Sequence, residues 1–320
     1  MLQQTYPLPE KISFEANAVK TLDLPTKGFI TGIDVAMSLN VTTDATAGGT
    51  PAEDALARII KRLAIYSGEK YYFYVRDGRQ LKFRTIYDFK KVKEDALPTA
   101  AGVTQDVKAL YKLRLGFEPS DPFDPSVVIP AELTESLTLE VLFGDAADLG
   151  SGYTINSGEI KLTIYRIILE AGEKVSDLYP AGFVEPRFTA EDIAIDQVVS
   201  DLGFERNIPV GNIIRRNWLL QLDSADNRSE AEVSEVGIKD ELNNVTPWAK
   251  DWDVLQAGDV LEYGLDTEYT GVAVIDGEEL SGVPFGFDTS EEYKAGQLKL
   301  AFTTLRTGGT VKVVYEQLHA

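Results

Sequence analysis

The chain has 320 residues, and 51 acidic against 31 basic side chains give it a formal charge of −20. It has no Cys and a single His, His319, which excludes disulfides, thiolate nucleophiles and Cys-based or multi-histidine metal sites and argues against a Ser-His-Asp triad. The negative field also disfavours broad nucleic-acid binding, because phosphates are held by clustered Lys and Arg.

The length predicts about two domains, and an apolar content of 44% is enough for a packed core. The first residues, MLQQTYPLPEKISFE, lack a basic segment followed by an apolar run, so we expect no signal peptide. No stretch approaches the ~18 apolar residues of a membrane-spanning helix.

Apolar residues alternate with polar ones along much of the chain, which is typical of half-buried antiparallel strands. In chain order, strands are predicted at 30–41, 62–66, 71–75, 110–117, 137–143, 160–167, 213–222, 260–263, 271–275, 298–305 and 311–315. Turns are expected at Ser67-Gly68, Asp77-Gly78, Asp276-Gly277 and Gly308-Gly309. The pattern predicts an all-β sandwich or barrel with minor helix.

Two helices are expected. Thr50-Pro51-Ala52-Glu53 has the residues of a helix start, and Leu56, Ile59, Ile60 and Leu63 follow at helical spacing, which predicts about three turns before the strand near Tyr66. A weaker helix is expected within 191–199.

The two halves of the chain resemble each other. Leu24-Pro25, a glycine and a long strand in the first half match Ile208-Pro209, a glycine and a long strand in the second. Each half also ends in two strands, at 137–143 and 160–167 and then at 298–305 and 311–315. The order is kept while the spacing shrinks, which favours a duplicated domain with shorter loops in its second copy.

Few patterns in the sequence point to chemistry, and we predict no catalytic, cofactor-binding or metal-binding residues. Asp223, Asp226 and Glu230 lack the spacing and the central glycine of a calcium loop and are interpreted as a solvated hairpin loop. Gly48-Gly49 and Gly308-Gly309 are interpreted as turns rather than phosphate-binding loops.

Three basic or titratable features have structural interpretations. Arg58, Lys61 and Arg62 are expected on a solvated helix face, and His319 is expected in an exposed tail. Arg215-Arg216 opens a strand, and the sequence leaves open whether the two cations meet acidic neighbours.

Two aromatic segments leave alternatives open. The run 71–74 has aromatic side chains on both faces of a strand, which fits either burial within the chain or contact with a partner. Trp248 and Trp252 are interpreted as part of an aromatic loop that forms either an interface anchor or a small core cluster.

These features together resemble the double jelly-roll major capsid proteins of tailless icosahedral viruses, the adenovirus-hexon lineage with phage and archaeal virus members. The resemblance is carried by 24–30 and the long strand after it, by the passage 55–65, by 208–216, and by the matching closing strands of the two halves. It covers nearly the whole chain through diffuse motifs.

The resemblance implies two tandem eight-stranded jelly-roll β-sandwiches, with the first at residues 1–172 and the second at 173–320. It further implies a structural, non-enzymatic capsid protein that forms pseudo-hexagonal homotrimers and tiles an icosahedral virion shell. Implied partners are neighbouring trimers, penton and minor capsid proteins and an internal viral membrane, with no direct nucleic acid, and the implied location is the virion, assembled in the host cytoplasm. No cofactor is expected, although a structural divalent cation is not excluded and is not located.

Two other functions fit the same β pattern. One is a carbohydrate-binding or carbohydrate-cleaving β-sandwich in which Trp248, Trp252 and tyrosines stack on sugars. The other is a viral spike or baseplate component. Under the capsid interpretation, the charge of −20 keeps free subunits apart, so assembly is expected to be favoured by salt or divalent cations.

Overall fold

The structure is a computed structural model that describes residues 2–180, 182–282, 286–290 and 293–319. The chain divides into two compact units, the first ending at Pro186 and the second running from Arg187 to His319. The boundary expected at residues 172 and 173 lies in the connection between two strands of the chain, β11 and β12, and stays a prediction.

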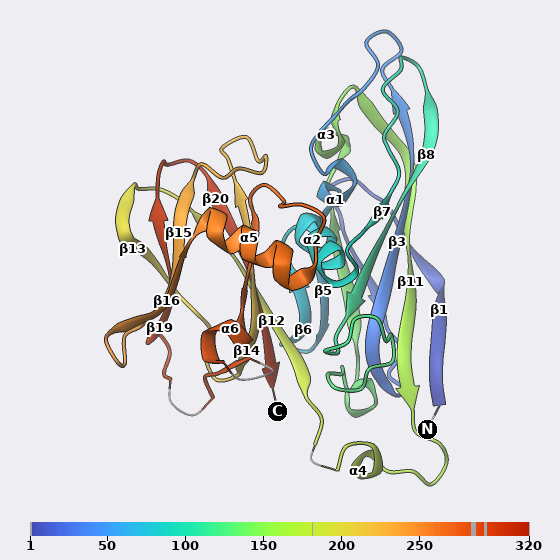
Figure 1. The fold of residues 1–320 in the computed structure, drawn as a ribbon. Helices are drawn as coiled ribbons and strands as arrows, with labels where there is room; N and C mark the ends of the chain where they lie inside the picture. The colour runs from blue at the N-terminus through green and yellow to red at the C-terminus, as the bar shows by residue number, and fades with distance from the viewer. Residues whose placement is uncertain (1, 181, 283–285, 291–292, 320) are drawn as a thin grey trace. The chain divides into compact units, whose positions relative to one another are not determined.

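The first unit is built from two sheets of long antiparallel strands (Figure 1). One sheet has the order β1-β11-β3-β8-β7 and the other β2-β9-β5-β6. The strands are β1 (Leu2–Ser13), β2 (Val19–Asp23), β3 (Phe29–Thr43), β5 (Ile60–Ser67), β6 (Lys70–Val75), β7 (Lys93–Glu94), β8 (Thr104–Arg114), β9 (Thr138–Phe143) and β11 (Tyr153–Ile168). Two short strands, β4 (Thr50–Pro51) and β10 (Gly150–Ser151), pair separately.

The second unit repeats this plan. Its sheets have the orders β12-β20-β14-β17 and β13-β19-β15-β16, and the short strand β18 (Phe287–Asp288) pairs with β14. The long strands are β12 (Glu185–Ala194), β13 (Val199–Asn207), β14 (Ile213–Leu222), β15 (Val233–Asp240), β16 (Val245–Asp251), β17 (Val272–Asp276), β19 (Leu298–Thr304) and β20 (Thr310–His319).

Both units therefore have the strand order of an eight-stranded jelly roll. If the eight long strands of a unit are numbered in sequence, one sheet reads 1-8-3-6 and the other 2-7-4-5 in each unit. The long strands after Leu24-Pro25 and Ile208-Pro209 are β3 and β14, the third strand of their unit. The two strands that close each half are β9 and β11 in the first unit and β19 and β20 in the second, one in each sheet of the unit. The internal repeat and the all-β double jelly roll are therefore confirmed.

Strict alternation of side chains forms the cores. Along β3, Ile33, Val35, Met37, Leu39 and Val41 are each at most 2% exposed, because a period of two places them on one face of the sheet. In the second unit, buried side chains from both sheets form one core cluster, including Phe204, Leu219, Val236, Leu300, Phe302 and Val313.

Helices are few, and two occupy equivalent places. They are α1 (Ala55–Arg58), α2 (Gly78–Phe89), α3 (Ala146–Leu149), α4 (Val175–Leu178), α5 (Trp252–Tyr263) and α6 (Gly277–Ser281), with a 3₁₀ turn at Ala131–Leu133. Both α2 and α5 follow the fifth long strand of their unit and precede the sixth. None of the helices in the described part of the chain is long and apolar enough to cross a membrane.

The expected three-turn helix after Thr50 is wrong. Thr50 and Pro51 form β4, which pairs with Ser151 and Gly150, and α1 is a single turn. The predicted helical apolar residues are buried, but the chain after Ile60 is held as β5 by pairing with β9 on one side and β6 on the other. Sheet pairing therefore overrides the local helical pattern.

Three further predictions are also wrong. Residues 191–199 form the end of β12, the connection at 195–198 and the first residue of β13 rather than a helix. The strand predicted at 260–263 is the last turn of α5. The pairs Asp77-Gly78 and Asp276-Gly277 begin helices rather than hairpins, and each aspartate accepts a hydrogen bond from the backbone N–H two residues later, at 2.9 Å.

Glycine at position 78 is required by close packing rather than by a turn. A Cβ at Gly78 would lie 2.1 Å from the carbonyl oxygen of Ala57, so the start of α2 can sit against α1 only without a side chain.

Substituting Phe302 tests the core of the second unit. Phe302 is fully buried beside Phe204, so Phe302→Ala should lower the free energy of unfolding by about 3–5 kcal/mol. All three tryptophans lie in the second unit, so their fluorescence in guanidinium titrations reports on this unit. Val198→Ala, at a side chain that is 62% exposed, is the control and should change little. Equal midpoints for both variants would show that Phe302 does not support the core.

Candidate interaction surfaces

The acidic loop after β14 is a turn held by its own aspartate. Asp223 accepts hydrogen bonds from the backbone N–H groups of Ala225 and Asn227 at 2.8 and 2.9 Å. These bonds lower the pKa of Asp223, chiefly through Asn227. Among the described residues, no group of three or more His, Asp or Glu side chains is arranged to hold a metal ion.

The basic residues expected on a helix face lie elsewhere. Only Arg58 is in α1, whereas Lys61 and Arg62 are in β5. Lys61 pairs with Asp148, and Arg62 with Glu140 at 2.6 Å across to β9. The expectation of a solvated helix face is therefore wrong, because these two cations pair with carboxylates of the same unit.

Arg215 and Arg216 share an acidic partner, a point that the sequence left open. Both pair with Glu316 on the neighbouring strand β20, at 3.1 and 3.2 Å, and the indole N–H of Trp218 donates to the same carboxylate at 3.0 Å.

His319, at the end of β20, is exposed, and its Nδ1 lies 3.0 Å from the side-chain oxygen of Asn212.

The tryptophans belong to the core of the second unit. Trp248 and Trp252 are 9% and 3% exposed and pack within its main core cluster, so the core alternative holds in a larger cluster than expected and the interface-anchor alternative is wrong. The expected aromatic loop is also wrong, because Trp248 lies in β16 and Trp252 begins α5. Tyr72 and Phe73 of β6 are both buried, whereas Tyr71 is 42% exposed. The run therefore contributes to burial on both strand faces and keeps one tyrosine at the surface.

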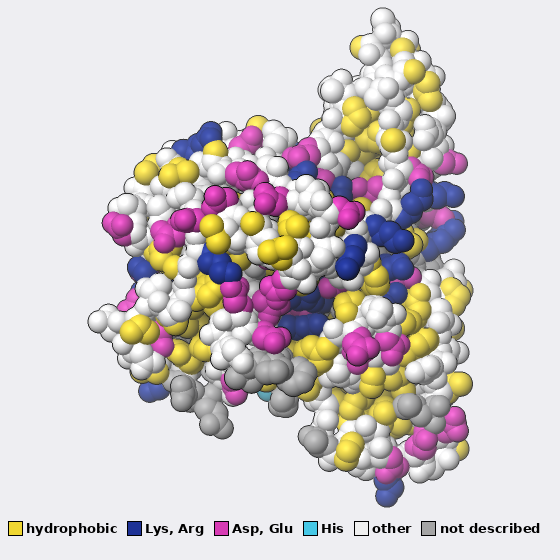
Figure 2. Space-filling view, viewed as in Figure 1, with side chains coloured by type: hydrophobic (Ala, Val, Ile, Leu, Met, Phe, Trp, Pro, Cys, Tyr) yellow, Lys and Arg dark blue, Asp and Glu magenta, His cyan; other side chains and the backbone are white. Residues whose placement is uncertain are grey.

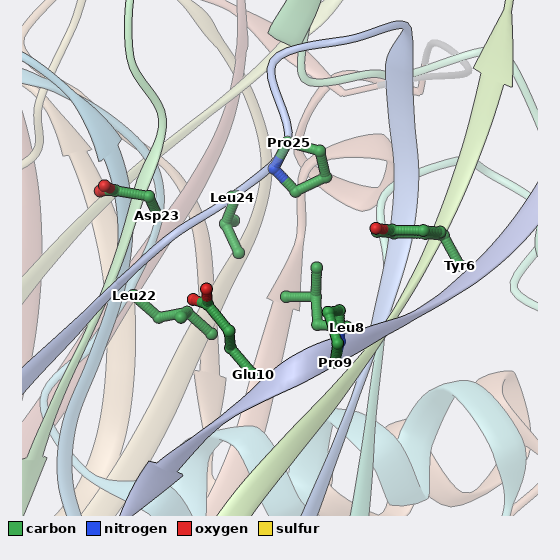
Figure 3. A pocket seen from close by; sticks show the side chains of 8 residues that line it. All are labelled: Tyr6, Leu8, Pro9, Glu10, Leu22, Asp23, Leu24 and Pro25. Atoms are coloured by element: carbon green, nitrogen blue, oxygen red, sulfur yellow. The ribbon is translucent and has the colours of Figure 1, made fainter.

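A small cavity of the first unit lies between the edge strand β1 and the end of β2 with the two residues that follow it. It has a volume of about 220 Å³ and is lined by Tyr6, Leu8, Pro9, Glu10, Leu22, Asp23, Leu24 and Pro25. In Figure 3, Leu8, Leu22 and Leu24 point toward one another, while the carboxylate of Asp23 points away. Proline in an edge strand removes a backbone donor, so Pro7 and Pro9 weaken this edge as a template for strand addition.

Helix α5 has an uncovered apolar face. Val254 and Leu261 are 53% and 85% exposed, with Ala257 and Gly258 between them. At 100° per residue these four side-chain positions fall on one side of the helix, and Asp253 and Glu262 flank them. We call Val254, Ala257, Gly258 and Leu261 the α5 stripe. Figure 2 shows hydrophobic side chains over α5 with acidic side chains around them.

The first unit has a groove bordered by basic side chains, in contrast to the acidic side chains that flank the α5 stripe. It has a volume of about 400 Å³ and lies between α2 and β8, lined by Thr85, Phe89, Lys91, Val92, Lys93, Leu110 and Lys112. We call it the basic groove. Figure 2 shows several basic side chains over the region of α2, β7 and β8.

Charge is distributed unequally between the two units. Residues 1–186 contain 20 basic and 26 acidic side chains, a net charge of −6, and residues 187–320 contain 11 and 25, a net charge of −14. Locally the contrast is stronger, since 82–93 contains five basic side chains and one acidic, and 251–279 contains nine acidic side chains and no basic one.

Comparison with known proteins finds solved structures of the same architecture. No protein-family model matches the chain, and no curated protein matches it. The STIV major capsid protein superposes with a TM-score of 0.82 at 17% identity, covering 99% of this chain and 96% of that one. The major capsid protein P2 of bacteriophage PM2 gives 0.57 at 12% identity over 100% and 98%, and the PBCV-1 virus capsid gives 0.63 at 8% identity over 99% and 93%.

The resemblance inferred from the sequence is thus confirmed at the level of fold, which is a double jelly roll. The α5 stripe and the basic groove were not predicted. The contrast between the basic segment 82–93 and the acidic segment 251–279 is visible in the sequence and could have pointed to both surfaces. The exposed apolar residues between the acids of α5 become recognisable only once the helix is known.

The turn at Asp223 gives a pH-dependent prediction. Asp223→Ala should cost about 1 kcal/mol at pH 7, because two backbone N–H groups lose their acceptor. The folded pKa is lowered, so this stabilisation is present above the ordinary carboxyl pKa and is lost as pH falls through the folded pKa. Tryptophan-detected unfolding at pH 7 and pH 3 measures the difference. Glu230→Ala in the same loop is the control, and a cost that is unchanged at pH 3 would contradict the prediction.

Proposed function

We propose that this chain is a major capsid protein whose copies build the shell of an icosahedral virion. The observation that carries the proposal is the match of two tandem jelly rolls in one chain, over 99% of this chain and 96% of the STIV major capsid protein. The similar fold of the capsid proteins of PM2 and PBCV-1 supports the same role. The role we propose is structural and involves no catalysis.

Homotrimers are the proposed building block. Each chain contributes two units of the same topology, so three chains in a closed ring would present a pseudo-hexagonal outline. Such an outline can tile a facet with many weak, specific contacts, in which charge sets the register more than the affinity. We also propose neighbouring trimers, penton and minor capsid proteins and an internal viral membrane as partners, with the virion as the site and the host cytoplasm as the place of assembly.

The carbohydrate-binding alternative loses its main support in the folded chain. It depended on Trp248 and Trp252 stacking on sugars, and both are buried in the core of the second unit. A spike or baseplate role has no particular observation in its favour.

Oligomeric state tests the proposal directly. Size-exclusion chromatography with light scattering should give a species of three times 35.2 kDa, and a gel of purified virions should be dominated by this band. A stable monomer, or a minor band in virions, would contradict the capsid role.

Salt should control assembly. With a formal charge of −20 per chain, trimers repel one another until counterions screen the charge, and the screening length falls from ~30 Å at 0.01 M to ~10 Å at 0.1 M salt. Assembly of dissociated trimers, followed by light scattering, should therefore increase with salt or divalent cations. Equal assembly at 0.01 M salt with chelator would show that repulsion between trimers is not limiting.

A further inference from the structure

We propose that the α5 stripe of one copy docks in the basic groove of a second copy, so that the second unit of one chain contacts the first unit of the next. The inference rests on the proposed function and deepens it, because it assigns the surfaces that hold the copies together.

The apolar parts of the two surfaces match in kind. The α5 stripe exposes Val254 and Leu261 with only the small Ala257 and Gly258 between them, and a Cβ at Gly258 would meet nothing nearer than the Lys250 amine at 4.0 Å. A partner backbone or side chain can therefore approach the helix closely. The basic groove offers Phe89, Val92 and Leu110 as apolar lining, and its ~400 Å³ can admit aliphatic side chains.

The charged borders are complementary. Asp253 and Glu262 flank the stripe, and Lys91, Lys93 and Lys112 border the groove. The acids beside the groove are engaged within the first unit, since Glu94 pairs with Lys82 at 2.6 Å and Asp88 with Arg84 at 3.6 Å. Lys93 itself pairs with Asp95 at 3.0 Å, so a carboxylate of the partner helix would share this exposed lysine with Asp95. Within the part of the chain that the structure describes, Lys91 has no carboxylate partner. Complementary charge of this kind orients a contact and rejects wrong pairings.

The acidic border of α5 carries unfavourable charge that lysines would relieve. Partial burial, followed by the neighbouring carboxylates of Asp276 and Glu279, raises the pKa of Glu262. Lys250 is the nearby cation, and it is paired with Glu279. Contact between this border and Lys91 and Lys93 of a second copy would bring further ammonium groups close to the mutually repelling carboxylates.

A second copy is the occupant that the chain itself favours. The helix with the apolar stripe lies in the unit with net charge −14, whereas the groove lies in a basic stretch of the unit with net charge −6. Both surfaces are present on every copy, so a contact between them is heterologous and can repeat around a ring.

Charge reversal on each surface tests the contact. The groove variant is Lys91→Glu with Lys93→Glu, and the helix variant is Asp253→Lys with Glu262→Lys. Each should weaken the trimer by about 100-fold in dissociation constant, because like charges would then face each other. The helix variant also reduces the net negative charge, so general repulsion predicts the opposite result for it. The fourfold variant should restore the trimer, because it exchanges the two signs.

A matched control makes the same change of charge elsewhere on the first unit. Lys27→Glu with Lys174→Glu alters two exposed lysines outside the groove and should leave the trimer intact. Light scattering across a dilution series measures all five proteins, and thermal melting of each checks that it is folded.

The possible outcomes separate this inference from the proposed function. A trimeric wild type whose association is unaffected by both reversals overturns the contact and leaves the capsid role standing. Loss of the trimer in each reversal without recovery in the fourfold variant also overturns the contact. A monomeric wild type overturns both proposals. Loss in each reversal with recovery in the fourfold variant supports the contact.

Discussion

Pairing between the first and the last long strand of each unit is the constraint on which the rest of the structure depends. β1 pairs with β11, and β12 pairs with β20, although many other strands separate them in sequence. Bringing together strands so far apart in sequence costs loop-closure entropy. The strands between them must therefore supply apolar faces whose burial offsets this cost and closes the sandwich. The alternating core of β3 and the core cluster of the second unit supply them.

How far the sequence predicts this fold depends on how strong the apolar pattern of each strand is: the edge strands β6 and β17 were predicted, whereas the central strand β15 was missed. The central strands β3 and β14 have long apolar patterns after Leu24-Pro25 and Ile208-Pro209, and these patterns were enough to detect the repeat. The edge strand β1 was missed, because its pattern is mostly exposed and includes two prolines. An edge strand needs less apolar surface than a central one, so its residues carry less of the signal.

Helix α5 was missed for a different reason, and with it the candidate site. Its buried face includes Gln256 and Asp259, which break the apolar period. Both are satisfied by backbone groups around β17: the Gln256 amide donates to the carbonyls of Tyr269 and Val272 at 2.8 and 3.0 Å, and Asp259 accepts from the N–H of Val274 at 2.9 Å. These partners come from the fold and not from the helix, so periodicity alone assigned the last turn to a strand. The buried face therefore mixes polar Gln256 and Asp259 with apolar Trp252 and Leu255, and the exposed side carries Val254 and Leu261, so the usual amphipathic pattern is blurred.

The uneven charge of the two units also bears on how copies can be ordered. A contact between two second units would oppose two charges of −14, whereas a contact between a second and a first unit opposes −14 to −6 and can place acidic α5 beside the lysines of the groove. Repulsion therefore disfavours a contact between two second units more than a contact between a second and a first unit, which acts as selection against that wrong contact. In a chain whose two units share one topology, shape alone distinguishes them poorly. In the proposed ring of copies, charge is then the property that keeps second units apart, and a ring in which each second unit meets a first unit would use both units of every chain.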